Sequence, residues 1–136
     1  MRKTIAYYGT CAARSRVTLA SKRIKQPYYV RQIQATFAPG CLNLVQLSFH
    51  ASLDASVPTS ARPDDPSILA ENGQVDYLVG DGDIKIVRHD LEIDEGGTYL
   101  KVHAYNQDWY DHAIDVQIEI DLVSDRTPVA PAAGGT

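Results

Sequence analysis

The strictest pattern in this sequence is the alternation of apolar and polar residues from His112 to Val123. Asp, Gln or Glu stands between successive aliphatic residues, which are Ile114, Val116, Ile118, Ile120 and Leu122. Because successive side chains of a strand point to opposite faces, this period predicts a β-strand with one buried face. A helix would scatter the same aliphatic residues around its circumference. The chain is therefore expected to fold around a sheet that buries one side.

Other segments alternate in the same way between turn residues, which predicts about seven short strands and a helical turn at residues 67–71. The further strand segments are 29–37, 44–51, 76–79, 84–87, 88–93 and 98–105, and residues 17–19 offer an extra one. We expect two antiparallel hairpins, one joining 76–79 to 84–87 and one joining 98–105 to 112–123. The connection from residue 52 to 76 is too long for a hairpin and is expected to cross between sheets. The predicted fold is an all-β antiparallel sandwich of jelly-roll or Greek-key type.

Length and composition fit one ordinary globular domain. The chain has 136 residues, of which 44% are hydrophobic and 22% charged. These values exclude wholesale disorder and a small scaffold held by many disulfides. No run of 18 apolar residues occurs, so we expect no membrane-spanning helix and no membrane partner.

The two cysteines and the N-terminus carry little functional signal. Cys11 and Cys41 lie in no CxxC pair and have no histidine at zinc-ligand spacing, so neither a metal nor a disulfide is required. We expect Cys41 to be a partly buried free thiol. The N-terminal basic pair is not followed by a continuous apolar stretch, so we expect no signal peptide.

Charge is distributed very unevenly along the chain. Residues 1–53 contain eight Lys or Arg and no Asp or Glu, whereas the net charge of the whole chain is -4. Such asymmetry is typical of interaction tails, so we expect a basic N-terminal arm (1–26), a β-sandwich domain (27–124) and a flexible C-terminal tail (125–136). The alternative is one folded domain whose charge is uneven along the sequence. The arm residues expected to dock electrostatically are Arg14, Arg16, Lys22, Arg23 and Lys25.

A second candidate site is a group of aromatic residues around the expected second hairpin, namely Tyr99, Tyr105, Trp109 and Tyr110. Such side chains anchor protein interfaces or stack on sugar rings, and the alternative is that they pack half-buried at one end of the sandwich. Tyrosines near the basic residues suit nucleic-acid stacking in principle. The acidic remainder of the chain would repel a polyanion, so we do not expect nucleic acid as a partner.

Metal and catalytic chemistry have weak support. Asp81 and Asp83 offer oxygen ligands for calcium, but too few of the required ligands are local, and a tight hairpin turn explains them better. A set at the ends of one loop, comprising His103, Asp108, Asp111 and His112, has no fixed metal geometry. Neither a G-x-S-x-G motif nor the His-x-His pair of cupin-type enzymes occurs. We therefore expect no enzymatic activity, no metal and no cofactor.

Residues 77–123, from YLVGDGDIKIVRHDLEIDEGG to the final alternating strand, resemble the small jelly-roll accessory proteins of virus particles. The resemblance is to the decoration or cement proteins of tailed phage capsids, and it lies in the short strands, the polar hairpin tip, the preceding arm and the short tail. It implies a structural virion protein made in the host cytoplasm. Its implied partners are other copies of itself, with a trimer favoured, and the major capsid protein. The competing hypothesis is a carbohydrate- or ligand-binding module that uses Tyr99, Tyr105 and Trp109.

Overall fold

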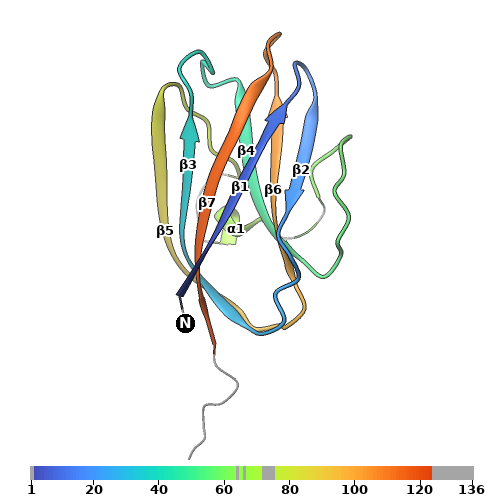
Figure 1. Ribbon diagram of the computed structural model, residues 1–136, viewed down its shortest axis with the longest axis vertical. Coiled ribbons are helices and arrows are strands. Elements are labelled where there is room, and N and C mark those ends of the chain that lie inside the picture. The colour runs from blue at the N-terminus through green and yellow to red at the C-terminus, as the bar shows by residue number, and fades with distance from the viewer. Residues whose placement is uncertain (1, 64, 66, 72–75, 124–136) are drawn as a thin grey trace, which may run out of the picture.

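The computed structural model describes residues 2–63, 65, 67–71 and 76–123. These residues form two antiparallel sheets that pack face to face (Figure 1). One sheet has the order β1-β7-β3-β5 and the other the order β2-β6-β4. The elements are β1 (Arg2–Cys11), β2 (Arg16–Ala20), β3 (Tyr28–Phe37), β4 (Val45–Ser52), α1 (Ile68–Glu71), β5 (Asp83–Ile93), β6 (Tyr99–Asn106) and β7 (His112–Leu122).

Strands that follow one another in the sequence alternate between the two sheets. Between β4 and β5 the chain returns to the edge of β4, where Ser67 forms an isolated bridge with His50 and Leu78 forms one with Leu47. This order is that of a jelly roll, a two-layer arrangement of paired Greek keys. The all-β sandwich predicted from the sequence is confirmed.

The core lies between the sheets and is built from alternate residues of each strand. Ile33 of β3 and Val116 of β7 face Phe49 of β4 and Val102 of β6, and all of these side chains are fully buried. On β7 the aliphatic positions are buried up to Ile120 while the residues between them are not. The alternation of residues 112–123 is thus confirmed as a strand with one buried face.

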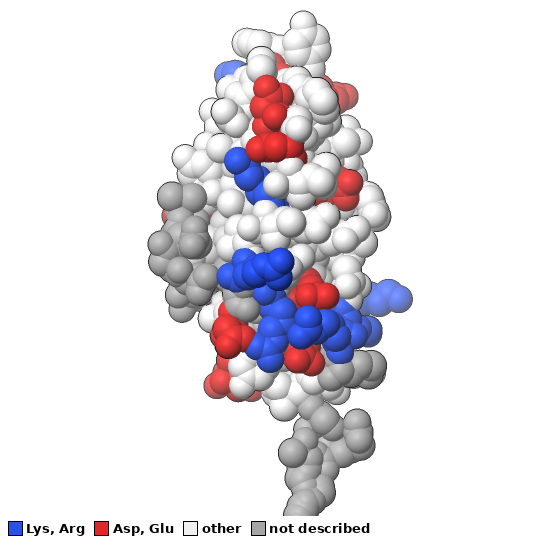
Figure 2. Space-filling view, turned by 90° about the vertical axis from the view of Figure 1, so that its left-hand side faces the viewer, with Lys and Arg blue, Asp and Glu red and all other residues white. Residues whose placement is uncertain are grey.

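On the outer face of the larger sheet, the charged side chains are cross-paired. Arg2 of β1 pairs with Glu119 of β7 at 3.2 Å, and Arg31 of β3 pairs with Asp90 of β5 and with Asp121 of β7. Figure 2 shows one side of the molecule, on which Lys and Arg gather with Asp and Glu in the lower half. Exposed pairs of this kind each stabilise a fold by at most about 1 kcal/mol.

Both predicted hairpins are wrong. β6 and β7 lie in different sheets, so residues 107–111 cross the end of the sandwich. Leu78 pairs with β4, whereas residues 84–87 and 88–93 form the single strand β5, which pairs with β3. Alternation reveals a buried face but not the strand that supplies the neighbouring hydrogen bonds, and a sandwich lets consecutive strands enter opposite layers.

The predicted N-terminal arm is also wrong, because most of residues 1–26 belong to the sandwich. β1 pairs with β7 over its whole length and β2 pairs with β6. Tyr7 is buried and its hydroxyl donates to the Leu100 carbonyl at 2.9 Å across the two sheets. The uneven charge therefore follows the alternative explanation, a single domain whose oppositely charged segments pair as strands. The predicted tail (125–136) lies outside the described residues.

Candidate functional site

Four chain connections meet at the upper end of the sandwich in Figure 1, and we call them together the loop end: residues 12–15, 38–44, 79–82 and 107–111. Hydrogen bonds join each connection to another. The amide of Arg14 donates to the Asp108 carbonyl at 3.0 Å, and the amide of Gln107 donates to the Leu44 carbonyl at 2.9 Å. The amide of Gly40 donates to the Asp81 carboxylate at 2.9 Å.

Two aromatic side chains project from this end. Trp109 and Tyr110 are each 74% exposed, and Leu42 on the neighbouring connection is 62% exposed. The guanidinium of Arg14 lies 4.5 Å from the centre of the Trp109 ring, and it also donates to the Gln107 carbonyl at 2.8 Å. Exposed Trp and Tyr side chains are typical anchors of protein interfaces because they bury large apolar areas on binding.

Asn106 fixes the loop that carries the two aromatic residues. Its side chain is fully buried, and its amide nitrogen donates to the carbonyls of Tyr110 at 2.7 Å and Cys11 at 3.1 Å. Its amide oxygen accepts from the Asp108 amide at 2.9 Å. One side chain therefore joins the β6–β7 loop to the end of β1.

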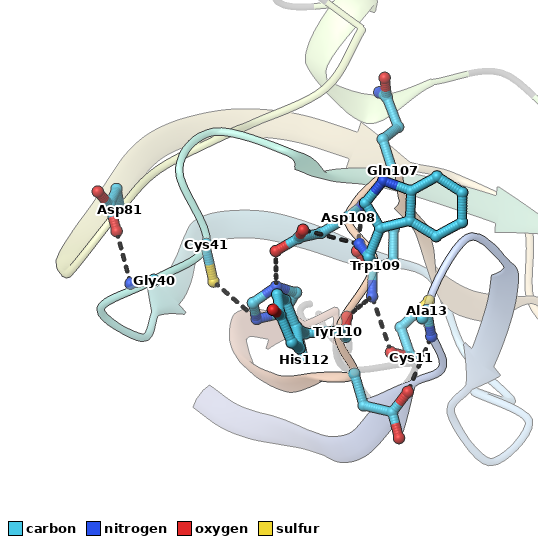
Figure 3. Close-up of polar contacts among 12 residues, drawn as sticks. Cys11, Ala13, Gly40, Cys41, Asp81, Gln107, Asp108, Trp109, Tyr110 and His112 are labelled. Carbon is cyan, nitrogen blue, oxygen red and sulfur yellow. Dashed lines mark hydrogen bonds and ion pairs between the residues drawn. The ribbon is translucent and has the colours of Figure 1, made fainter.

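A hydrogen bond between His112 and Asp108 closes the same loop, as Figure 3 shows. Nε2 of His112 lies 2.8 Å from the Asp108 carboxylate, which also accepts from the Trp109 amide at 2.7 Å. These two bonds hold the pKa of Asp108 below its ordinary value. The backbone next to Trp109 is therefore restrained by the side chains of both Asn106 and Asp108. We call this hydrogen-bonded backbone the fixed base of the two aromatic side chains.

The backbone of the loop end is itself unusual. Arg14, Leu42 and Asn43 have φ values of 56°, 51° and 60°, and among the described residues no other non-glycine residue has a positive φ. This conformation is disfavoured for side chains other than glycine, most clearly for a bulky one such as Leu42. Backbone strain of this kind clusters at functional sites.

Of the sequence candidates for metal binding, the structure brings Asp108 and His112 together, with 2.8 Å between their side chains. Among the described residues, no group of three or more His, Cys, Asp and Glu side chains is placed to hold a metal. Asp83 accepts from the Asp81 amide and pairs with Lys85 at 3.1 Å, while Asp111 accepts from the Ala13 amide. His103 lies on the outer face of the smaller sheet, separate from Asp108 and His112.

Both cysteines are buried free thiols. Burial raises the pKa of Cys11 and of Cys41 above the ordinary value. The Sγ atom of Cys41 lies 3.7 Å from Nδ1 of His112, and Cys11 donates to the Ser15 carbonyl. The sequence-based expectation for Cys41 was partial burial, and the structure buries it almost completely.

We expect neither thiol to react readily with a thiol-specific chromogenic reagent in the native protein, because the thiolate is the reactive form and both groups are buried. Unfolding in denaturant should release two reactive thiols per chain. Rapid reaction of the native protein, measured by absorbance, would contradict this expectation.

The five basic residues expected on an arm occupy three different places. Arg14 lies at the loop end, and the guanidinium of Arg16 covers the Tyr105 ring at 3.9 Å on the outer face of the smaller sheet. Lys22, Arg23 and Lys25 lie between β2 and β3, beyond the end of β2 that is remote from Arg14. They cannot act as one patch.

The four aromatic candidates likewise do not share one surface. Trp109 and Tyr110 lie together at the loop end, whereas Tyr99 and Tyr105 begin and nearly end β6. Tyr99 and Tyr105 are themselves about 20 Å apart along β6, since a strand rises about 3.4 Å per residue. Between them Lys101 and His103 are buried.

The residues over Lys101 and His103 come from the connection between β4 and β5. Thr18 donates to the Pro58 carbonyl at 2.6 Å, and Nδ1 of His50 lies 3.1 Å from the Asp65 carbonyl. Lys101 lies 4.0 Å from the Asp65 carboxylate. These contacts between the β4–β5 connection and the outer face of the smaller sheet were not predicted from the sequence. The one sequence feature that pointed to them is the length of the connection between residues 52 and 76.

No protein-family model and no curated protein matches the chain. Among the described residues, no helix has the length and apolar character needed to cross a membrane.

Proposed function

We propose that this protein is a structural component of virus particles, a decoration, cement or minor capsid protein that self-associates and binds neighbouring capsid subunits. The observation that carries the proposal is the loop end, where Trp109 and Tyr110 are exposed on a hydrogen-bonded base. Jelly rolls are common among capsid proteins, which adds support by analogy of fold.

The fixed base matters for binding strength. A loop that is already ordered before binding loses less conformational entropy when it meets a partner. Asn106, Asp108 and Arg14 hold the backbone around Trp109, and Trp109 and Tyr110 still remain exposed. The loop end is therefore suited to fill an apolar pocket on a neighbouring subunit.

Particles provide the direct test. Virus particles from the source of the sequence are purified on a density gradient, and their proteins are quantified by mass spectrometry. We expect this chain in a fixed ratio to the major capsid protein. Its absence from intact particles would overturn the proposal.

Replacing Trp109 and Tyr110 with alanine should weaken particle binding while leaving the fold intact. Because both side chains are 74% exposed, the free energy of unfolding should change by less than about 0.5 kcal/mol. Loss of a central aromatic anchor typically costs about 2 kcal/mol or more of binding energy. The measurement is co-sedimentation with particles that lack the protein.

The matched control is Tyr8→Ala, which removes an aromatic side chain that is 66% exposed on β1 and does not belong to the loop end. This control should bind particles as the wild type does. Equal binding by all three proteins would exclude the loop end as the contact.

A second function, binding of a carbohydrate or another small polar ligand, is favoured by one feature. A cavity of about 230 Å³ lies on the outer face of the smaller sheet beside Tyr105 and Tyr77, with Arg16, Arg62 and Asp76 at its wall. Aromatic and planar polar side chains together suit sugar recognition. A glycan array should then give binding that is lost in Tyr77→Ala and retained in Trp109→Ala, and an array with no binding would exclude this function.

A further inference from the structure

Two grooves of opposite charge lie on opposite lateral edges of the sandwich. β1 and β2 form one edge of their sheets, and β5 and β4 form the other. Each edge carries a groove between the two layers. The grooves have volumes of about 630 Å³ and 410 Å³, so each has room for side chains of a partner.

The groove along β1 and β2, which we call the basic groove, combines an apolar floor with a cationic rim. Ile5, Ile24 and Ile120 are among the residues of its floor. Among the described residues that line it there are four basic side chains and no acidic one, and the basic residues are Lys3, Lys22, Arg23 and Lys25. These are exposed, and among the described residues none of them forms an ion pair.

The groove between β4 and β5, the acidic groove, has the same construction with the opposite charge. Its floor includes Ile68, Leu91 and Ile93. Among the described residues that line it there are five acidic side chains and no basic one, and the acidic residues are Asp54, Asp65, Glu92, Asp94 and Glu95. Asp65 lies near Lys101, whereas Glu92, Asp94 and Glu95 are exposed at the rim.

Both grooves lie near the same end of the molecule. The bridge between Ile24 and Thr98 joins the β2–β3 connection to the β5–β6 connection. Ile24 lines the basic groove and Thr98 lines the acidic groove. The two grooves therefore lie on either side of the bridge between Ile24 and Thr98, and they face in opposite directions.

We propose that the partner of the basic groove is the acidic groove of a second copy of this chain, so that copies associate head to tail. Opposite charges on matching surfaces attract and orient the two copies, and the apolar floors of both grooves lose contact with water on association. A two-fold symmetric contact would place each groove against its own kind, which repels. The contact is therefore heterologous, and it produces a ring if its rotation closes.

This inference deepens the proposed function, because it names the surfaces through which the particle protein self-associates. It assigns the basic residues near Lys22 a role different from that of Arg14. The loop end remains free for the capsid, since it lies at the opposite end of the strands from Lys22 and Asp94. Self-association and capsid binding can then occur at the same time.

Charge reversal on either side tests the inference. The first variant carries Lys22→Glu and Lys25→Glu, and the second carries Asp94→Lys and Glu95→Lys. The mass of each protein in solution is measured by light scattering after size exclusion, at low and high salt. We expect the wild type to form an oligomer that dissociates in high salt, because the charged rims are screened, and each variant alone to be monomeric.

Mixing the two variants gives the sharpest result. The first variant retains its acidic groove and the second its basic groove, and the two reversed grooves are again opposite in charge. The mixture should therefore associate into an oligomer in which the two variants alternate, although each variant alone is monomeric. A chain with all four reversals should regain the wild-type oligomer. The control Lys85→Glu with Arg88→Glu makes the same change in net charge on β5 outside both grooves and should leave the oligomer unchanged.

An oligomer that persists unchanged in both variants would overturn the groove contact while leaving the particle proposal standing. A wild type that is monomeric at every concentration would also overturn it. The particle composition and the co-sedimentation of the Trp109 variant decide the proposed function separately. Each failure therefore identifies which of the two inferences is wrong.

Discussion

Asn106→Ala is expected to lower the free energy of unfolding by about 3 kcal/mol, because it leaves one buried and two half-buried backbone groups without their hydrogen bonds to this side chain. The side chain is 0% exposed. Its removal leaves the carbonyls of Tyr110 and Cys11 and the amide of Asp108 without these hydrogen bonds. Water cannot reach a site closed by two loops and a strand end as easily as it reaches an exposed turn, so most of the cost is retained.

Urea unfolding followed by circular dichroism measures this effect. Asn106→Asp separates the lost donors from the lost volume, since it keeps the size of the side chain but turns a carboxylate toward carbonyl oxygens. It should destabilise the fold at least as much as alanine. The neighbouring control, Gln107→Ala, changes a half-buried side chain and should cost less than about 0.5 kcal/mol. A loss below about 1 kcal/mol for Asn106→Ala would contradict the proposed role of this residue.

The same substitution also bears on the loop end. If Asn106 fixes the loop that carries Trp109, particle binding by Asn106→Ala should fall even under conditions where the variant is fully folded. The affinity lost would measure how much the ordered loop contributes. Unchanged binding would show that Trp109 and Tyr110 need no fixed base.

Acidification is expected to remove about 3 kcal/mol of stability through His103. Burial, the nearby Arg16 and His50, and Arg62 lower the pKa of His103 from 6.5 to about 4. A shift of one unit corresponds to about 1.4 kcal/mol. The unfolded chain binds the proton near pH 6.5 and the folded protein only near pH 4, so the free energy of unfolding falls as the pH falls through this window.

Hydrogen bonds around His103 explain why the folded protein resists protonation. The Thr18 hydroxyl donates to the Pro58 carbonyl, so it must accept from Nδ1 of His103 at 2.7 Å. Nε2 of His103 then carries the lone pair, which accepts from the Arg16 guanidinium at 3.2 Å. A proton on Nε2 would face that cation. Burial lowers the pKa of His50 as well, which acts in the same direction.

Urea unfolding at a series of pH values, together with NMR titration of the imidazoles, tests this prediction. His103→Gln removes the titrating group, so its stability should depend less steeply on pH between 6.5 and 4 than that of the wild type. The carboxylates with lowered pKa values, Asp108 among them, keep their contribution throughout this window, because it is lost only as the pH falls below their ordinary pKa of 3.8. An NMR pKa for His103 close to its ordinary value would contradict the prediction.

The strands themselves were largely predictable from the sequence. Local alternation identified the segments that became β3, β4, β6 and β7, and the helical turn at 67–71 corresponds to α1 (Ile68–Glu71). These features depend on residues a few positions apart, whose side chains reach the same face of a strand wherever the strand lies. The fold class followed because many such strands with short turns can bury their apolar faces only against one another.

The candidate site was only partly predictable. Exposed aromatic residues in a short loop were recognisable, and Trp109 and Tyr110 do lie together. The role of Asn106 was not recognisable, because a polar residue at the end of a strand fits the sequence pattern equally well whether its side chain faces water or joins two loops. The prediction that the basic residues form one docking surface was wrong for a related reason. Arg14, Arg16 and Lys22 are close in sequence but lie on three different surfaces.

The sequence by itself determined that this chain makes strands with one apolar face and that these strands pack as a sandwich, because side-chain direction and burial are local properties of the pattern. Tertiary structure alone decided which strands are neighbours, that β1 and β2 are edge strands in place of an arm, and that four connections converge beside Trp109. It also decided the segregation of charge into two grooves on opposite edges. Strand pairing and groove formation join residues far apart in sequence, such as Tyr7 and Val116, and only the packing of the whole chain selects among the many pairings that alternation permits.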